Sequence, residues 1–284
     1  MDLNERVEAA LQRHLAGRDC PPKLGAAMHH ALFPGGARVR PVLSLSVALA
    51  CGDDRPGVSD AVAAAVEALH CASLVHDDLP CFDDAAVRRG RPSVHVAHGE
   101  AAAVLAGDGL IVLAFQWLAD VGAEAGERLS PLLSELARCA GTPAGLVAGQ
   151  ALEAESDAGL SAYHAAKTGA LFEAAAAGGA LAAGGDADVW RAVGRGLGAA
   201  YQIADDIHDQ AGADGALGKP TGQDARLGRP NAVDALGLDD AVTLLKRTLA
   251  DTASRVPDGP MADTLRAFIE QQATRFVPSL SSAA

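Results

Sequence analysis

Pairs of adjacent aspartates are the chemical feature that stands out in this sequence. They lie at positions 53–54, 77–78, 83–84, 205–206 and 239–240. The pair at 53–54 follows a glycine, and the pair at 239–240 stands at an expected helix start. Aspartate commonly caps a helix or occupies a turn in such places, so a double aspartate is a weak signal by itself.

The two pairs that follow the segment ALHCASLV have a different setting. Asp77 and Asp78 close this long apolar segment at an expected helix C-terminus, where the helix dipole disfavours negative charge. Pro80 then turns the chain, and Asp83 and Asp84 follow. We therefore expect these carboxylates to lie close together at the end of one buried helix.

A second acidic cluster ends another apolar segment, AAYQIADDIHD. It contains Asp205, Asp206 and Asp209, and Asp205 and Asp209 share a helix face because they are four residues apart. Like charges at that spacing destabilise a helix unless a cation lies between them, and carboxylate oxygens are the ligands that Mg²⁺ prefers. Either cluster alone fits a solvated helix end equally well. The presence of both favours a metal site.

Basic residues accompany the acidic clusters, which suggests an anionic ligand. They are Arg38, Arg40, Arg88, Arg89, Lys167 and Lys219, with Thr168 next to Lys167. Simpler interpretations are a surface pair for Arg88 and Arg89, and a side chain that reaches out to solvent for Lys167. Beside metal-binding carboxylates, however, these cations favour a diphosphate or triphosphate substrate. The sequence has no G-x-x-x-x-G-K-[ST] segment, so P-loop chemistry is not the explanation.

The elements that must position these residues are helices, because apolar residues recur at helical spacing and alternating β-branched runs are missing. Long helices are expected at 58–79, 100–121, 160–183 and 187–209, and shorter ones at 3–16, 39–50, 131–140, 143–156, 239–253 and 261–276. We find no β-hairpin signal, no repeat and no shift in composition. The expected fold is one all-α domain over residues 1–284, a bundle of about ten or more mostly antiparallel helices.

The overall composition indicates a soluble protein that binds neither nucleic acid nor membranes. The 284 residues include 23 Lys and Arg against 36 Asp and Glu, a formal net charge of −13, which disfavours phosphate backbones and anionic lipid. The most apolar stretch, 104–119, is interrupted by Asp108 and is too short for an integral membrane segment. The five cysteines form no C-x-x-C pair, and the charged N-terminus has no apolar core. We therefore expect a reducing, cytoplasmic location.

Several segments resemble, in order, the motifs of the trans-prenyltransferase, or polyprenyl diphosphate synthase, family. The resemblance runs from Phe33 to Val233 through FPGGARVRP, HCASLVHDDLPCFDDAAVRRGRPS, GEAAAVLAGDGL, GLVAGQALE, YHAAKTGALFEAA, AYQIADDIHD and LGKPTGQD. The first two segments look most like those of geranylgeranyl diphosphate synthases from carotenoid-making purple bacteria. The resemblance implies a helical bundle around a deep central pocket, usually in a homodimer.

The resemblance also implies a reaction and its site residues. An allylic diphosphate (dimethylallyl, geranyl or farnesyl) would ionise to a carbocation and condense head to tail with isopentenyl diphosphate. About two to three Mg²⁺ ions, or Mn²⁺ instead, would be held by Asp77, Asp83 and Asp205, with Asp78, Asp206 and Asp209 close by. The expected catalytic residues are Lys167, Thr168, Gln202, Lys219 and Arg88, and the expected isopentenyl diphosphate site is Arg40, His70, Arg89 and Arg38.

Some positions depart from the family pattern. Ala37 stands where a lysine that contacts isopentenyl diphosphate is usual, so binding would be weaker unless Arg38 compensates. Glu153 replaces the shorter aspartate of the GQxxD segment, which could shift a contact behind the metal ligands. Other departures are Ala85, Ala86, Val96 and Gln223. None of them removes an expected metal ligand.

Product length in this family depends on the side chain one turn before the first aspartate motif. Members that stop at the farnesyl length tend to have Tyr or Phe there, whereas this chain has Ala72 and Ser73 as its chain-length gate. Small residues also serve tight helix packing, which is the simpler interpretation. We expect a pocket that extends past Ala72 and a geranylgeranyl product.

Three alternative functions stay open. A farnesyl diphosphate synthase would share every motif. A non-catalytic partner subunit of a prenyl synthase is favoured mildly by Ala37 and opposed by the intact aspartate motifs. A class I terpene cyclase would not need Arg40, Arg89 and His70 for a second diphosphate, and it would be expected to have more than 4% aromatic residues.

Overall fold

The structure, a computed structural model, describes residues 2–17, 19–153, 155, 163, 165–211, 232–259 and 261–276. The helices of the first half are α1 (Leu3–Leu15), α2 (Pro22–Leu32), α3 (Val39–Ala50), α4 (Pro56–Asp77), α5 (Val94–His98), α6 (Glu100–Asp120) and α7 (Gly122–Ala125). Those of the second half are η1 (Gly126–Arg128), α8 (Leu129–Ala140), α9 (Leu146–Leu152), the π-helical turn η2 (Ala165–Gly169), α11 (Ala170–Ala182), α12 (Ala187–Ala211), α14 (Ala232–Leu236), α15 (Leu238–Ser254) and α16 (Ala262–Phe276).

Helices α4 and α11 form the interior of the bundle. Both are apolar nearly all round, and a helix of that kind is stable only when most of its faces are buried. Helix α4 packs against α1, α3, α6 and α11, while α11 also packs against α8 and α12. Because α11 consists largely of alanine and glycine, its neighbours approach its backbone closely. The expectation of an all-α bundle is confirmed.

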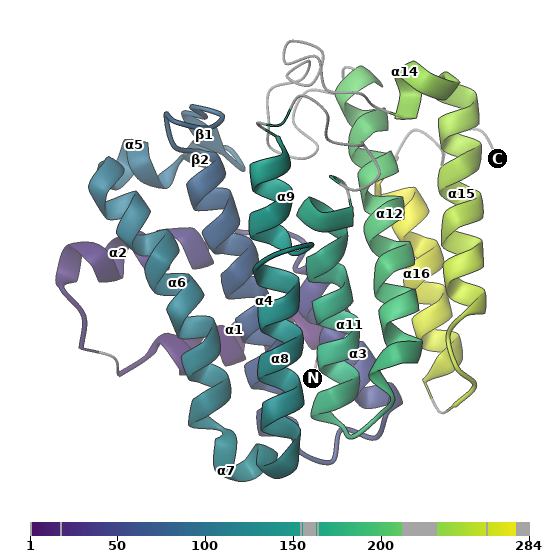
Figure 1. The fold of residues 1–284 in the computed structure, drawn as a ribbon, viewed down its shortest axis with the longest axis horizontal. Coiled ribbons are helices and arrows are strands. Elements are labelled where there is room, and N and C mark those ends of the chain that lie inside the picture. The colour runs from purple at the N-terminus through teal and green to yellow at the C-terminus, as the bar shows by residue number, and fades with distance from the viewer. Residues whose placement is uncertain are drawn as a thin grey trace.

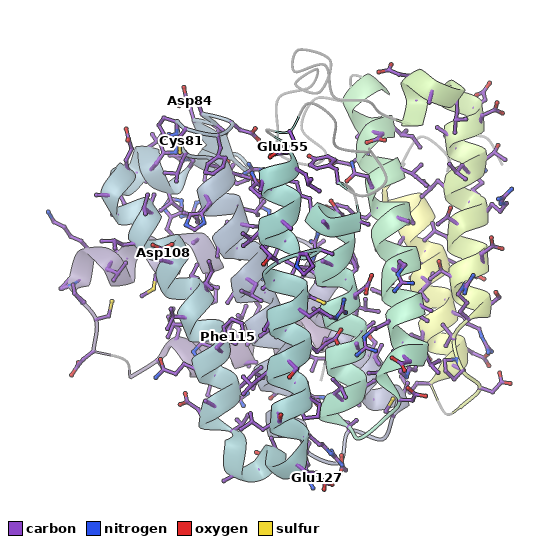
Figure 2. The ribbon with its side chains drawn as sticks, in the orientation of Figure 1. Cys81, Asp84, Asp108, Phe115, Glu127 and Glu155 are labelled. Atoms are coloured by element: carbon purple, nitrogen blue, oxygen red, sulfur yellow. The ribbon has the colours of Figure 1, made fainter. Side chains whose placement is uncertain are left out.

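Figure 1 shows α11 in a row of helices that runs from α6 on one side, through α8, α11 and α12, to α15 on the other. Helix α4 ends, and α6 and α11 begin, at the upper end of this view, where α9 and α12 also terminate. Figure 2 labels Cys81, Asp84 and Glu155 at that end and Glu127 at the opposite one. The upper end of the bundle is therefore where the described site segments at the ends of α4, α9 and α12 and at the start of α11 meet.

Two helices, α4 and α6, are long and apolar enough to cross a membrane by length and composition. The apolar window of α4 is 83% buried inside the protein, as expected for a core helix, whereas that of α6 is only 39% buried. Its exposed apolar residues include Val104, Leu105 and Val112. Helix α6 therefore presents an apolar face at the surface of the chain.

A short β-hairpin corrects the expectation that the chain contains none. Strands β1 (Val87–Arg88) and β2 (Arg91–Pro92) pair antiparallel, with Arg88 opposite Arg91. The turn residues Arg89 and Gly90 have φ angles of 53° and 74°, and a two-residue turn of the favoured type I′ needs positive φ at both positions. Arginine rarely adopts this conformation, so the sequence carried no turn signal. Here Nη1 of Arg89 donates a hydrogen bond to the carbonyl of Gly35 at 2.5 Å and anchors the turn.

Helix α2 was also missing from the sequence prediction. Its segment PKLGAAMHHAL contains a glycine and two histidines that weaken the apolar pattern. Ala27, Met28, Ala31 and Leu32 are nevertheless buried, and the helix packs against α6. The expected helix at 143–156 is shorter, since α9 ends at Leu152. Residues 160–162 and 164 of the expected helix at 160–183 lie outside the described residues.

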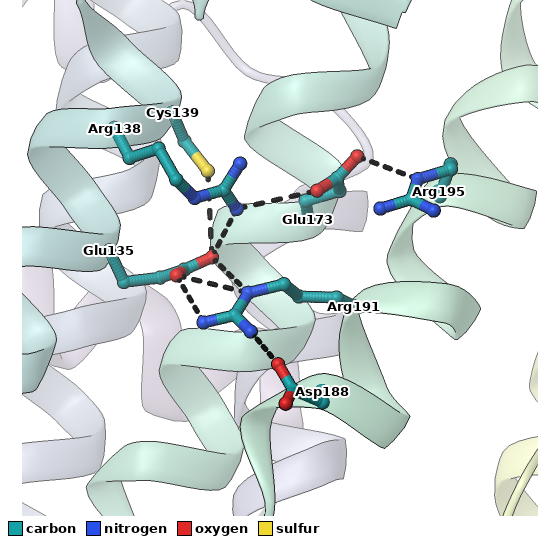
Figure 3. Close-up of polar contacts among 7 residues, drawn as sticks. All are labelled: Glu135, Arg138, Cys139, Glu173, Asp188, Arg191 and Arg195. Carbon is teal, nitrogen blue, oxygen red and sulfur yellow. Dashed lines mark hydrogen bonds and ion pairs between the residues drawn. The ribbon is translucent and has the colours of Figure 1, made fainter.

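An ion-pair network centred on the buried Glu135 fastens α8, α11 and α12 together (Figure 3). The Glu135 side chain, 4% exposed, accepts hydrogen bonds from Arg191 at 2.7 and 3.1 Å and from Arg138 at 2.6 Å. Arg138 also pairs with Glu173, and Glu173 pairs with Arg195. Burial favours the neutral carboxyl, but the hydrogen bonds from Arg191 and Arg138 outweigh it and lower the pKa of Glu135.

The lowered pKa predicts an acid-sensitive contribution to stability. A carboxylate with a depressed pKa in the folded state stabilises the protein fully above its unfolded value, 4.5, and loses this contribution as pH falls through the folded value. We expect Glu135→Gln to lower the free energy of unfolding near neutral pH by about 2 kcal/mol, because Arg138 and Arg191 lose charge-assisted hydrogen bonds to a buried carboxylate. Urea unfolding at a series of pH values measures this effect.

The matched control is Glu127→Gln, since Glu127 is an exposed glutamate at the end of the bundle away from the aspartate motifs. It should leave both the stability and its acid dependence near those of the parent chain. Equal losses in the two variants, or an unchanged acid limb in Glu135→Gln, would contradict the role assigned to the network.

Candidate active site

Helix α4 carries the first aspartates to the upper end of the bundle. Asp77 is its last residue and Asp78 is its C-cap. The loop that follows folds back onto the helix end, where the amide of Asp83 donates to the carbonyl of Asp77 at 2.9 Å and the amide of Ala85 to that of Asp78 at 3.2 Å. These bonds satisfy carbonyls that a helix end leaves without partners. They also bring Asp83 next to Asp77.

Asp78 holds Arg88 of the hairpin. Nε of Arg88 donates to both carboxylate oxygens, at 3.0 and 3.2 Å, and Nη2 donates to Oδ1. The side chain of Asp78 is 3% exposed and that of Arg88 is 10% exposed. A two-point ion pair of this kind fixes the guanidinium in place. Asp78 therefore fastens the hairpin to α4 and sets the position of Arg88.

Lys167 lies between two carboxylates on the other side of Asp77. Its Nζ is 2.5 Å from Oε1 of Glu153 and 3.5 Å from Oδ1 of Asp77. Gln150 joins the same two carboxylates, because its Nε2 donates to Asp77 at 2.5 Å and to Oε2 of Glu153 at 3.0 Å. Lys167 is carried by the π-helical turn η2, and turns of this type are frequent at functional sites. A Cβ on Gly149 would come within 2.2 Å of the Lys167 nitrogen, so only glycine lets α9 approach η2.

The second acidic helix is linked to η2 through a chain of hydrogen bonds. The Thr168 hydroxyl donates to the amide oxygen of Gln202 at 2.9 Å, and the Gln202 amide nitrogen donates to Asp206 at 3.0 Å. Asp206 is buried and Asp205 is half-buried. The structure thus brings the expected residues Thr168, Gln202 and Asp206 together. The side chain of Asp209 and all of Lys219 lie outside the described residues.

The carboxylates of these two segments have the donor chemistry that a hard divalent cation needs. In the part of the chain that the structure describes, no group of three or more His, Cys, Asp or Glu side chains is already arranged around a metal position. Instead, Lys167 and Gln150 lie against Asp77. The residues therefore fit Mg²⁺ by chemistry, provided that Lys167 and Gln150 give up their contacts with Asp77.

A separate basic cluster is centred on Arg40. Its guanidinium lies 4.5 Å from the ring centroid of Phe172 and 5.4 Å from that of Tyr201, and Nη1 is 3.4 Å from Nε2 of His70. Among the described residues, Nε of Arg40 is buried and has no hydrogen-bond partner. Burial, followed by the charges of Arg40 and Arg89, holds the pKa of His70 well below its usual range. Burial also lowers the pKa of Arg40. A buried arginine with an unused donor is suited to an anion.

Arg38 serves the scaffold in this structure. Its side chain is 2% exposed, and it donates to Glu67 at 2.6 Å, to Glu8 at 2.7 Å and to the carbonyl of Leu32 at 2.7 Å. Each of its three nitrogens therefore has a partner within the fold. This arrangement gives no support to the idea that Arg38 compensates for Ala37.

The two expected chain-length positions lie on α4 below Asp77. Ala72 is 1% exposed, and Ser73 is half-buried with its hydroxyl donating to the carbonyl of His70 at 2.8 Å. One turn above, the ring of His76 lies against Gly107 of α6, where a Cβ would come within 2.1 Å of its Nε2. Both expected positions are therefore small residues about one turn before His76 on α4.

Sequence reasoning missed three aromatic residues of the site. Phe172 and Tyr201 flank Arg40, and the hydroxyl of Tyr163 donates to Oε1 of Glu153 at 2.5 Å. Tyr163 stands four residues before Lys167, at a helical spacing that could have suggested the contact. Phe172 and Tyr201 gave no signal, because aromatic residues in apolar helices are ordinarily part of the core.

Comparison with known proteins agrees with this arrangement. Residues 21–257 match the family model described as "Polyprenyl synthetase". The geranylgeranyl diphosphate synthase of Cereibacter sphaeroides is 49% identical over 98% of both chains. That of Rhodobacter capsulatus is 48% identical over 100% of this chain and 99% of its own.

Solved structures with this fold include a geranyltransferase from Legionella pneumophila, with a TM-score of 0.83 and 29% identity over 98% of this chain and 96% of the other. A geranyltransferase from Helicobacter pylori, solved with magnesium and isoprenyl diphosphate, has a TM-score of 0.79 and 28% identity over 99% of this chain and 95% of the other.

The family match and the relatives confirm the resemblance drawn from the motifs, including the likeness to the enzymes of purple bacteria. They also confirm the expected enzyme class, because these relatives are prenyltransferases that make isoprenoid diphosphates. The chain belongs to the polyprenyl synthetase family.

Proposed function

We propose that the chain is a geranylgeranyl diphosphate synthase, a single synthase domain that condenses isopentenyl diphosphate with an allylic diphosphate in the presence of Mg²⁺. The observation that supports this proposal is that two clusters of charged side chains with different chemistry lie at one end of the bundle. One combines carboxylates with Lys167 and Arg88 and suits a diphosphate bound through a metal. The other is the buried cationic cluster around Arg40, whose Nε has no hydrogen-bond partner among the described residues and suits an anion without a metal.

The allylic diphosphate belongs in the carboxylate site. Asp77, Asp83 and Asp205 would hold about two to three Mg²⁺ ions, or Mn²⁺, which neutralise the diphosphate as the allylic C–O bond breaks. The chain's own contribution is the ammonium of Lys167 and the guanidinium of Arg88, which Asp78 keeps in a fixed orientation. From the family resemblance, Lys219 adds a further positive charge.

The carbocation left by this ionisation needs polar groups beside it. Thr168 donates its proton to Gln202, so the lone pairs of its hydroxyl oxygen are directed away from that bond, where they can face the cation. Asp206 accepts from the amide nitrogen of Gln202 and thereby sets which way the amide points. The departing diphosphate takes the proton lost in the final step, so the mechanism needs no separate general base. Exclusion of water protects the cation from hydrolysis.

Isopentenyl diphosphate belongs in the pocket of Arg40, Arg89 and His70. The lowered pKa of His70 keeps its imidazole neutral, so it avoids adding repulsion beside Arg40. Phe172 and Tyr201 offer ring faces that stabilise the Arg40 cation in the absence of an anion. Arg38 is linked to this site through its ion pair with Glu67, because the charge of Glu67 also acts on Arg40.

Product analysis tests the proposed reaction. The purified chain is incubated with Mg²⁺, isopentenyl diphosphate and, in separate reactions, dimethylallyl, geranyl or farnesyl diphosphate. We expect geranylgeranyl diphosphate from each starter. Release of farnesyl diphosphate as the final product would support the shorter synthase instead, and no condensation with any starter would favour a non-catalytic partner subunit.

The small residues below Asp77 predict how product length can be changed. Ala72→Tyr would place a ring where the growing chain passes, and we expect the main product to shift to farnesyl diphosphate. Because Ala72 is buried, Ser73→Phe provides a second variant at a half-buried position. Circular dichroism checks that both variants fold. An unchanged product distribution in two folded variants would exclude this part of α4 from control of length.

We propose a homodimer formed through α6. The exposed side chains Val104, Leu105 and Val112 are 41%, 56% and 65% accessible and follow one side of the helix, as an apolar contact surface would. Such a face is better suited to a second copy of this chain than to lipid, because Asp108 lies among these residues and is itself exposed.

The free thiols of all five cysteines favour the proposed cytoplasmic location.

A charge placed on this face should separate the subunits. We expect Val112→Asp to halve the mass measured by light scattering after size-exclusion chromatography, because it buries a second carboxylate one turn from Asp108 with no partner of its own. Val96→Asp is the control, since Val96 is 54% exposed but lies on α5. A monomeric parent chain, or an unchanged dimer in Val112→Asp, would contradict the proposed interface.

A further inference from the structure

Glu153 accepts hydrogen bonds from three side chains. The hydroxyl of Tyr163 and the ammonium of Lys167 both donate to its Oε1, each at 2.5 Å, while Gln150 donates to Oε2 at 3.0 Å. Its side chain is 12% exposed, and that of Lys167 is 16% exposed. Both side chains of this ion pair are therefore largely buried. The contacts therefore define one arrangement of Lys167.

That arrangement is not the one in which Lys167 contributes to catalysis. The lysine lies 3.5 Å from Oδ1 of Asp77. A divalent cation bound to this carboxylate would repel the ammonium and weaken its contact with Asp77, because both carry positive charge. The three charged groups Asp77, Glu153 and Lys167 carry a net charge of −1, which attracts such a cation. Lys167 must then move from the carboxylates towards the bound diphosphate.

The free-energy cost of moving Lys167 away depends on which hydrogen-bond donors remain on Glu153. Glu153 is largely buried, and a buried carboxylate oxygen that loses a donor is destabilised. The hydroxyl of Tyr163 is bound to the same oxygen that Lys167 would leave. Tyr163 is uncharged, so a metal ion at Asp77 does not repel it, and it can continue to donate to Glu153 after Lys167 has gone.

We propose that Tyr163 and Glu153 form a holding site for Lys167, in which Tyr163 is a positioning residue that lowers the cost of releasing the lysine to the diphosphate. The ring of Tyr163, 5.9 Å from Nζ, keeps the ammonium near the holding site until then. This inference rests on the proposed function, since it assigns the diphosphate of the allylic substrate as the destination of Lys167. It gives Tyr163 a task that is separate from holding the fold together.

The test removes the hydroxyl and then the charge that it supports. In Tyr163→Phe, Lys167 must leave Glu153 with one donor fewer, so we expect inorganic pyrophosphate with Mg²⁺ to bind about tenfold more weakly in calorimetry. The kcat/KM for the allylic diphosphate should fall by about the same factor, while the KM for isopentenyl diphosphate stays unchanged.

Glu153→Gln provides the decisive comparison. A neutral amide holds Lys167 less strongly and loses less when the lysine leaves, so the hydroxyl of Tyr163 should matter much less in that background. We expect the tenfold effect of Tyr163→Phe on pyrophosphate binding to shrink to less than about twofold in the double variant. A purely structural role for Tyr163 would instead lower the melting temperature and leave an equal loss of binding in both backgrounds.

The outcomes separate this inference from the proposed function. If the parent chain binds pyrophosphate and makes product but Tyr163→Phe behaves like the parent, the holding site is wrong and the synthase assignment stands. An undiminished effect of Tyr163→Phe in the Glu153→Gln background also overturns the holding site. If the parent chain neither binds pyrophosphate nor condenses substrates, the proposed function fails first.

Discussion

The pairing of buried carboxylates with cations from neighbouring elements holds the upper end of this bundle together. Burying a charge without a partner is costly, so each aspartate that an apolar helix carries into the interior needs a counter-charge. Arg88 from the hairpin supplies it for Asp78, and Lys167 from η2 lies beside Asp77. The same charges that stabilise the end of the bundle also bind the substrate in the proposed reaction. Stability and function therefore use one set of groups.

The interior helices make this arrangement possible. Helices α4 and α11 are apolar nearly all round and lie at the centre, so their ends have fixed positions relative to each other. Helix α12 packs along α11 and brings Gln202 within hydrogen-bonding reach of Thr168. The network around Glu135 also fastens these helices, since Glu173 of α11 pairs with Arg195 of α12. Rigid helices thus position a small number of polar side chains.

Much of the fold could be predicted from the sequence because helical periodicity is a local property. The helix at 39–50 has the expected bounds, and the aspartate segments lie at helix ends as expected. The hairpin could not be predicted, since the left-handed conformation of Arg89 accompanies a contact with Gly35, a residue distant in sequence. Helix α2 was missed because burial against α6, rather than a strong apolar pattern, accounts for it.

In the candidate site, too, residue types could be predicted from the sequence but their tertiary contacts could not. Residue type and order identified the carboxylates, Lys167 and Arg40, because their chemistry is visible in the sequence. Partners could not be identified in that way. The sequence alone does not reveal that Arg38 pairs with Glu67, or that Tyr163 and Lys167 share one oxygen of Glu153. Such contacts depend on which elements the fold places side by side.

The central claim is that one end of the bundle holds two diphosphate sites of different kinds, one dependent on metal and one independent of it. Calorimetric titration of the parent chain with isopentenyl diphosphate in the presence of a chelator tests this claim most directly. Arg40→Gln is the comparison, and Arg247→Gln, at an exposed position of α15, is the control. We predict that isopentenyl diphosphate binds without metal. Arg40→Gln should weaken this binding by about tenfold or more, whereas Arg247→Gln should leave it unchanged. Binding that requires Mg²⁺, or that ignores the loss of Arg40, would contradict it.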